Sequence, residues 1–140
     1  MLCATNESNL KTVLIIGLIA TLQSCCPFIK EEHLGNNLYL SEYDNIDRRI
    51  LYSKESCAAS GVEIVPMTVL EYDYDSKWII AKSGNKRENS NIQYWIIKND
   101  FDDEATSKVI KSKTIGPLDL GLFSEELTRR QIQLKLKKIE

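Results

Sequence analysis

The amino-acid sequence predicts an α+β fold, an antiparallel β meander of about six short strands with one C-terminal helix. The strands would form a small sheet or a half-barrel. Short apolar runs follow one another at hairpin-length spacing, with no helical segments between them that could serve as parallel crossovers. The chain then ends in a segment whose acidic start and basic finish match the polarity of a helix.

The first predicted strands form a hairpin. Residues 38–43 alternate between two faces, with Leu38, Leu40 and Glu42 on one and Tyr39, Ser41 and Tyr43 on the other. A second apolar run, 49–53, follows the turn residues Asp44 and Asn45. Residues 62–65 and 68–74 continue the meander, and Pro66 between them indicates a bulge, an edge or a strand end.

The next strands are predicted at 78–82 and 91–98. Residues 92–97 are apolar on both faces, which favours a central strand. Residues 99–107 carry four acidic side chains and are predicted as an exposed loop. A short strand at Val109–Ile110 follows, and Gly116-Pro117 ends it.

The C-terminal helix is predicted from Ser124 as N-cap, Glu125 and Glu126 in the first turn, and basic residues toward the end. An alternative stays open for residues 131–137. Polar and apolar side chains alternate there as they would in a strand.

The N-terminal segment predicts where in the cell the protein is located. An apolar run from Val13 to Leu22, preceded by Lys11, leads into Leu22-Gln23-Ser24-Cys25. This layout resembles bacterial lipoprotein precursors, in which a small residue precedes cleavage and the next cysteine accepts lipid. An uncleaved membrane anchor would need about 20 apolar residues, and the run from Val13 to Leu22 is only about half that length. A core helix should be amphipathic, whereas this run is apolar on all sides.

The resemblance implies a domain organisation. Residues 1–24 are a signal peptide cleaved between Ser24 and Cys25, and Cys25 carries diacylglycerol and a fatty acid such as palmitate. Residues 25–37 are then a lipidated tether, and residues 38–140 a single β-rich domain. The mature protein would sit in the cell envelope, anchored by lipid at the periplasmic face or the cell surface.

Cysteine and histidine usage predicts neither a metal site nor a cofactor. The chain has four cysteines and one histidine. Cys3 leaves with the signal and Cys25 carries lipid, so only a Cys26–Cys57 disulfide is compatible with an oxidising envelope. His33 is predicted to be a solvated tether residue.

A second resemblance covers residues 38–135. Its landmarks are Asp75-Ser76-Lys77-Trp78-Ile79-Ile80-Ala81-Lys82, Tyr94-Trp95-Ile96-Ile97 and Ile115-Gly116-Pro117-Leu118. The pattern is similar to a family of small uncharacterised bacterial proteins, many of them lipoproteins. It implies a fold and no catalytic residues.

Two residue groups are candidate sites. Glu71, Asp73 and Asp75 alternate with tyrosines, so three carboxylates would share one strand face and could bind metal or act as acid and base. The competing interpretation is a solvated hairpin face, because the calcium-loop pattern is incomplete. Trp78, Tyr94 and Trp95 could contribute to a platform for sugar or peptide, but Tyr94 and Trp95 must face opposite sides, so at most one of them could join Trp78. Aromatics in strands are also more often core.

The sequence therefore favours a small interaction module, anchored by lipid and not an enzyme, with an envelope protein as its partner. A formal net charge of −2 gives no argument for binding nucleic acid. The alternative is a lipid-anchored enzyme or metal-binding protein that uses Glu71, Asp73 and Asp75.

Replacing Cys25 by serine is expected to leave a full-length, non-lipidated precursor, because neither Cys3 nor Cys26 directly follows a Leu-x-Ser triplet. Mass spectrometry of the membrane fraction measures processing and acylation. Normal acylation of the Cys25→Ser chain would contradict the assignment.

Overall fold

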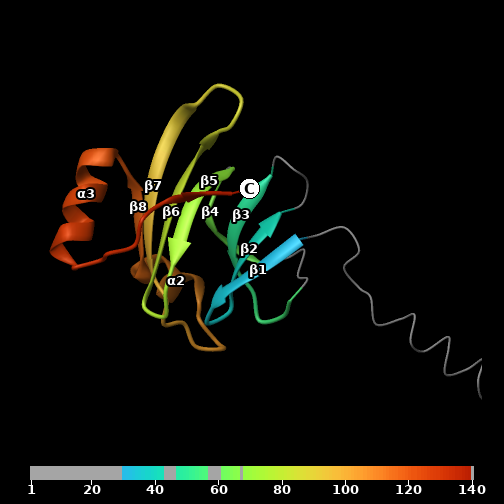
Figure 1. Ribbon diagram of the computed structural model, residues 1–140. Helices are drawn as coiled ribbons and strands as arrows, with labels where there is room; N and C mark the ends of the chain where they lie inside the picture. Colours follow the sequence, from blue (N-terminus) through green and yellow to red (C-terminus); the bar gives the residue numbers. More distant parts are fainter. Residues whose placement is uncertain (1–29, 43–46, 57–60, 67, 140) are drawn as a thin grey trace, which may run out of the picture.

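The computed structural model describes residues 30–42, 47–56, 61–66 and 68–139. Two antiparallel sheets pack face to face, and helix α3 covers the outer face of the larger sheet (Figure 1). The predicted fold class, antiparallel β with a C-terminal helix, is confirmed. The meander is divided between two sheets instead of forming one.

The smaller sheet has the order β1-β2-β3-β4. Its strands are β1 (Lys30–Gly35), β2 (Leu38–Glu42), β3 (Arg48–Tyr52) and β4 (Val62–Val65). Leu38 and Leu40 of β2 face Tyr52 and Ile50 of β3 across the ladder, and all four side chains are buried. The predicted face that carries Leu38 and Leu40 is therefore the core-facing side of β2.

The predicted tether is wrong for residues 30–37, which belong to the folded domain. Strand β1 pairs with β2, and its Leu34 is only 1% exposed. Gly35, Asn36 and Asn37 form the connecting turn with φ angles of 108°, 44° and 64°, values that glycine and asparagine tolerate best. The charges of Lys30, Glu31 and Glu32 resembled a solvated linker because β1 is an edge strand.

The larger sheet has the order β8-β7-β6-β5-β9. Its strands are β5 (Val69–Tyr74), β6 (Trp78–Asn85), β7 (Ser90–Lys98), β8 (Thr114–Leu118) and β9 (Lys137–Lys138). The predicted central strand is confirmed, because β7 lies between β6 and β8 and is covered on both faces. Gly116 and Pro117 lie within β8, so they do not end a strand at Val109–Ile110.

Val109 and Ile110 are helical and not a strand. They lie in α2 (Ser107–Lys113), where the Thr106 hydroxyl caps the first turn by accepting from the Val109 N–H. Ile110 is the buried side chain of this short helix. The two β-branched residues favoured a strand, and the helix cap at Thr106, three residues before Val109, indicates the helix instead.

The C-terminal helix exists, but its boundaries differ from the prediction. Helix α3 spans Leu120–Arg129, and Asp119 caps it by accepting from the Leu122 N–H at 2.9 Å. Gln131, with φ 57°, lies just beyond its end. The following tail is extended and ends in β9. The alternative interpretation of residues 131–137 is therefore correct that polar and apolar side chains alternate there along an extended chain. Neither helix among the described residues is long and apolar enough to span a membrane.

Two apolar clusters hold the layers together. The cluster between the sheets includes Leu38, Ile50, Val65, Ile79, Trp95 and Ile97. The cluster beneath α3 is centred on Ile80, Ile96 and Phe123, with Leu127, Ile132, Leu134 and Leu136 packed against it. The helix and the extended tail together cover the outer face of the larger sheet.

Replacing Trp95 by alanine is expected to lower the free energy of unfolding by about 3 to 5 kcal/mol. The side chain is 6% exposed, and its Nε1 donates a hydrogen bond to the buried Ser83 hydroxyl at 2.9 Å. Chemical denaturation of the purified chain measures the loss. Tyr74→Ala, at a side chain 37% exposed, is the control and should cost much less. Equal losses would contradict the assignment of Trp95 to the core.

Candidate functional site

The predicted carboxylate row is engaged in internal contacts. Glu71 Oε1 lies 2.8 Å from the Lys82 ammonium on the neighbouring strand β6. Asp75 lies just beyond β5, and its Oδ1 accepts from the backbone N–H groups of Lys77 and Trp78 at 2.7 and 2.8 Å. The Glu71–Lys82 pair joins β5 to β6, and the Asp75 hydrogen bonds stabilise the turn between them. Both carboxylates therefore have partners that a substrate or a metal would have to displace.

Asp73 fastens the C-terminal tail to β5. Its carboxylate accepts from Lys137 Nζ at 2.8 Å and from the Lys135 N–H at 3.1 Å. Burial acts to raise the pKa of Asp73, but these two hydrogen bonds, together with the charge of Lys137 and the Tyr74 backbone N–H, hold the pKa below its usual value. No cluster among the described residues has the histidine, cysteine or carboxylate ligands for a metal ion.

The two tyrosines of this strand face β1. Their rings stack with centroids 6.2 Å apart, and the Tyr72 hydroxyl donates to Glu32. Burial, followed by the contact with Glu32, raises the pKa of Tyr72, and the hydrogen bond to Glu32, followed by burial, raises the pKa of Tyr74. Both phenols stay protonated at neutral pH and serve as hydrogen-bond donors instead of bases.

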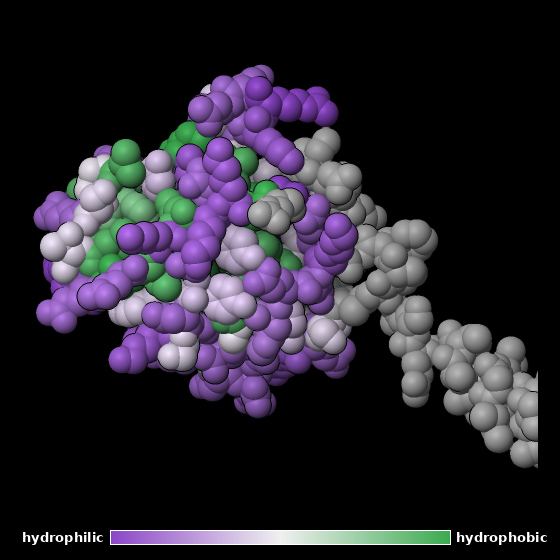
Figure 2. Space-filling model, in the orientation of Figure 1, coloured by the Kyte–Doolittle hydropathy of each residue, from purple (hydrophilic) through white to green (hydrophobic). Residues whose placement is uncertain are grey.

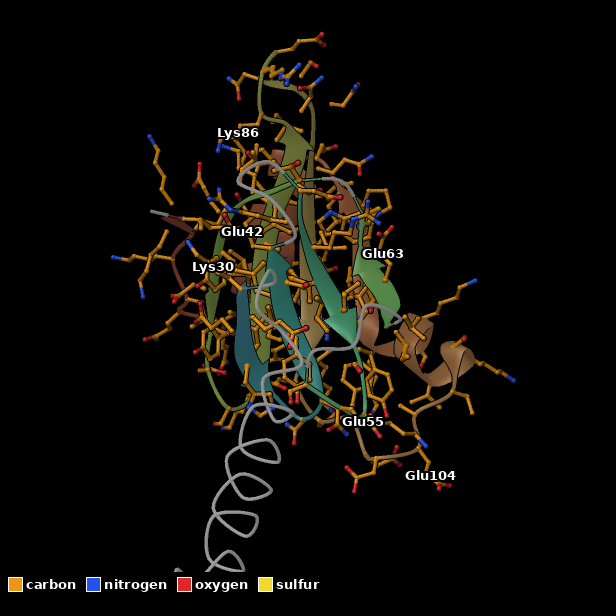
Figure 3. All side chains as sticks on the ribbon, turned by 90° about the vertical axis from the view of Figure 1, so that its right-hand side faces the viewer. Lys30, Glu42, Glu55, Glu63, Lys86 and Glu104 are labelled. Atoms are coloured by element: carbon orange, nitrogen blue, oxygen red, sulfur yellow. The ribbon has the colours of Figure 1, made fainter. Side chains whose placement is uncertain are left out.

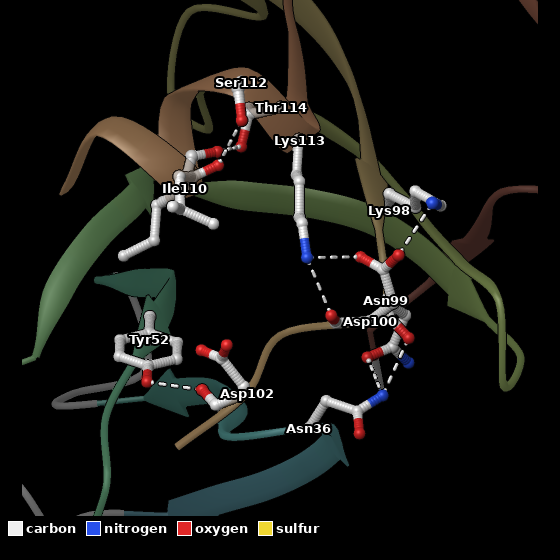
Figure 4. A network of polar contacts seen from close by, with 11 residues as sticks. Asn36, Tyr52, Lys98, Asn99, Asp100, Asp102, Ile110, Ser112, Lys113 and Thr114 are labelled. Carbon is white, nitrogen blue, oxygen red and sulfur yellow. Dashed lines mark hydrogen bonds and ion pairs between the residues drawn. The ribbon is translucent and has the colours of Figure 1, made fainter. Parts of the chain in front are cut away.

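The acidic loop after β7 is also engaged with the domain (Figure 4). Asp100 lies 2.7 Å from Lys98 and 2.9 Å from Lys113, and these two hydrogen bonds lower the pKa of its carboxyl. The Tyr52 hydroxyl donates to the Asp102 carbonyl at 2.8 Å. The predicted exposed loop is therefore attached through its backbone and its first carboxylate.

Asn99 is the buried centre of this end of the molecule. It is 2% exposed, and its Nδ2 donates to the carbonyls of Leu34 and Asp75 at 2.8 and 2.9 Å. Its own N–H donates to the Lys77 carbonyl, while Asn36 Nδ2 donates to the Asn99 carbonyl. One asparagine thus joins turns from both sheets, which is a structural role.

The aromatic platform is not present as an open surface. Trp78 and Tyr94 lie under α3, where Arg130 stands 5.5 Å from the Trp78 ring and Phe123 lies 4.9 Å from Tyr94. Trp95 lies on the opposite face, between the sheets. The alternative that these aromatics are core residues is correct.

The N-terminal site residues lie outside the described residues. These are Ser24, Cys25 and Cys26, together with Cys57, so the cleavage site, the lipidation and the disulfide stay predictions.

Two large hydrophobic side chains are exposed at the start of α3. Leu120 and Leu122, in the first turn of α3, are 59% and 50% exposed, and Figure 2 shows hydrophobic side chains gathered on the α3 side of the molecule.

A groove that the sequence did not predict is lined by residues from both sheets. It has a volume of about 430 Å³ and runs between β4 on one side and α2 with β8 on the other. Its lining is mainly apolar and consists of Val62, Glu63, Ile64, Pro66, Trp95, Ser107, Ile110, Lys111, Thr114 and Gly116. Figure 3 shows Glu63 at this side of the small sheet, away from Lys30 and Glu42.

Gly116 allows β8 to pack directly against Trp95, which lines the groove. Its φ is 147°, and a Cβ atom there would stand 2.6 Å from Trp95 Cε3. Any side chain at this position would collide with the indole, so glycine allows β8 to pass directly over it. The sequence contains the landmark Ile115-Gly116-Pro117, but the aromatic side chain that Gly116 approaches depends on the pairing of β8 with β7.

The two charged side chains on the groove rim, Glu63 and Lys111, differ in their ion pairing. Glu63 is paired with Arg49 at 2.6 Å. Lys111, on the opposite rim, takes part in none of the ion pairs found among residues 30–42, 47–56, 61–66 and 68–139. Within the part of the chain that the structure describes, the groove therefore combines an apolar floor with a rim lysine, Lys111, for which no ion pair is found.

Replacing Asp73 by asparagine is expected to weaken the loss of stability on acidification. Since folding holds the pKa of Asp73 below its usual 3.8, the carboxylate contributes stability that is complete above that pH and is lost as the pH falls through the lower folded-state pKa. Thermal unfolding between about pH 6 and pH 2 measures the difference. Asp102→Asn is the control, and equal acid sensitivity of Asp73→Asn and wild type would contradict the role of Asp73.

Comparison with known proteins identifies a family without a known activity. No curated protein and no solved structure matches the chain. Residues 35–140 match the family described as protein of unknown function (DUF3997). That range covers both sheets from the β1–β2 turn onward, both helices and the groove. The chain therefore belongs to the family of proteins of unknown function DUF3997.

Proposed function

We propose that this protein is a lipid-anchored envelope protein that acts as a small interaction module and contacts a partner protein through the β4 groove. The observation that carries the proposal is the open, mainly apolar groove between β4, α2 and β8, with Trp95 on its floor. Apolar concave sites with a few polar groups are the usual places for ligand binding. The lipid anchor on Cys25 rests on the Leu-Gln-Ser-Cys sequence.

Binding is favoured over catalysis by the state of the titratable groups. Glu71 and Asp73 are each paired with a lysine, and Asp75 caps a turn. An acid–base pair needs a group with a pKa near the working pH that can reach a substrate. The pKa of Asp73 is lowered and that of Tyr72 is raised, so both move away from neutrality.

The lipid anchor and the groove would have separate roles. The lipid on Cys25 would confine the domain to the membrane surface, and the groove would select the partner there. Confinement raises the effective concentration of two membrane-bound partners by orders of magnitude. A modest groove is then sufficient for stable contact in the envelope.

A photo-reactive amino acid in place of Val62 is expected to form crosslinks to one envelope protein in intact cells that express the full-length chain. Val62 is 41% exposed on the groove rim, so the probe can reach a partner without disturbing the core. The same probe at Lys86, in the exposed β6–β7 hairpin tip, is the matched control (Figure 3). Mass spectrometry identifies the products.

Cys25→Ser should reduce the Val62 crosslink, because the chain would no longer be confined with its partner. Equal crosslinking from Val62 and Lys86 would contradict the groove as the contact surface. A Val62 crosslink that persists fully in Cys25→Ser would contradict the contribution of the anchor.

A further inference from the structure

We propose that the β4 groove binds an extended peptide segment that pairs with the edge of β4, inserts an apolar side chain over Trp95 and places a carboxylate beside Lys111. This inference rests on the proposed function and specifies the chemistry of the partner. Three observations support it: the character of the β4 edge, the shape of the groove and the charge of its rim.

The β4 edge differs from the other sheet edges among the described residues. Edge strands expose unpaired N–H and C=O groups, and proteins protect them with charge, proline or short length. Strand β1 carries Lys30, Glu31 and Glu32, β8 contains Pro117, and β9 consists of two lysines. Strand β4 is also short and carries one charge, Glu63, but its other three residues are valine or isoleucine, and it pairs with β3 on one side only.

The groove beside this edge suits one or two side chains of an extended segment. Its volume of about 430 Å³ lies at the low end of small-ligand sites. A strand added to β4 would direct alternate side chains to the same face. Ile64, Ile110 and Trp95 offer those side chains an apolar floor.

The rim selects an anionic group. Glu63 already binds Arg49, whereas Lys111 on α2 has no ion-pair partner among the residues described. Ser107 and Thr114 line the same side as Lys111. A carboxylate of the peptide, either an acidic side chain or the C-terminus, would supply the missing partner and fix the orientation of the bound strand.

Trp95 provides a direct readout of binding. The chain has two tryptophans, so Trp78→Phe leaves Trp95 as the single tryptophan, which is excited selectively at the red edge of the absorption band where tyrosine does not absorb. The full-length Trp78→Phe chain in detergent is titrated with acetylated pentapeptides that carry valine, isoleucine, leucine or phenylalanine at the second and fourth positions and end in aspartate. At least one peptide is expected to shift the Trp95 emission saturably at millimolar concentration or below.

Three comparisons separate the parts of the inference. The peptide with asparagine amide in place of the terminal aspartate should bind roughly tenfold more weakly. Lys111→Gln should remove this difference, while Lys108→Gln, an exposed lysine of the same helix that does not line the groove, should preserve it. N-methylation of the peptide backbone should abolish binding, because it removes the donors that pair with β4.

Other outcomes overturn the inference. These are no saturable shift with any peptide, equal affinity for the aspartate and amide forms in the chain with Lys111, or undiminished binding of N-methylated peptides. A shift caused by decanoate but not by the peptides would assign the groove to an acyl chain and also overturn it. If Val62 crosslinks an envelope protein while no peptide binds, the interaction module stands and only the peptide chemistry is wrong.

Discussion

The pairing of β6 with β7 is the contact on which the other layers depend. Ile79 faces Ile97 and Ile80 faces Ile96 across the ladder, and all four side chains are fully buried. Ile79 and Ile97 belong to the cluster between the sheets, whereas Ile80 and Ile96 belong to the cluster under α3. Burying each such side chain contributes about 1.5 to 3 kcal/mol, so one hairpin supplies apolar surface to both interfaces. Without this two-faced hairpin, neither the small sheet nor the helix would have a layer to cover.

The parts of the fold that depend on local pattern could be predicted from the sequence. The run 92–97 identified a strand buried on both faces, and the alternation from Leu38 identified β2. What could not be predicted depends on distant contacts. Strand β1 appeared to be a tether because only its Leu34 reaches the core, and Asn99 appeared to be a loop residue because its partners Leu34, Asp75 and Lys77 are remote in sequence.

The same distinction between local pattern and distant contacts applies to the candidate sites. The alternation of Glu71 and Asp73 correctly placed two carboxylates on a strand, but their pairing with Lys82 and Lys137 required the register of β6 and the return of the tail as β9. The groove left no linear motif, because its lining comes from β4, β7, α2 and β8. Gly116 was the closest sequence signal, since a glycine before proline in a strand indicates a close backbone approach.

The proposed function accounts for a contact surface as small as β4. Its four residues can add only a few backbone hydrogen bonds to a partner strand, each with a net value of about 0.5 to 1.5 kcal/mol, so the isolated interaction would be weak. A short edge is also safer, because a long apolar edge would pair with other copies of the chain. Under this proposal the lipid on Cys25 would supply the missing affinity by concentrating both partners in the same membrane. Under the same proposal the short edge and the anchor would act together, because an edge too weak to aggregate would still bind its partner when both are confined to one membrane.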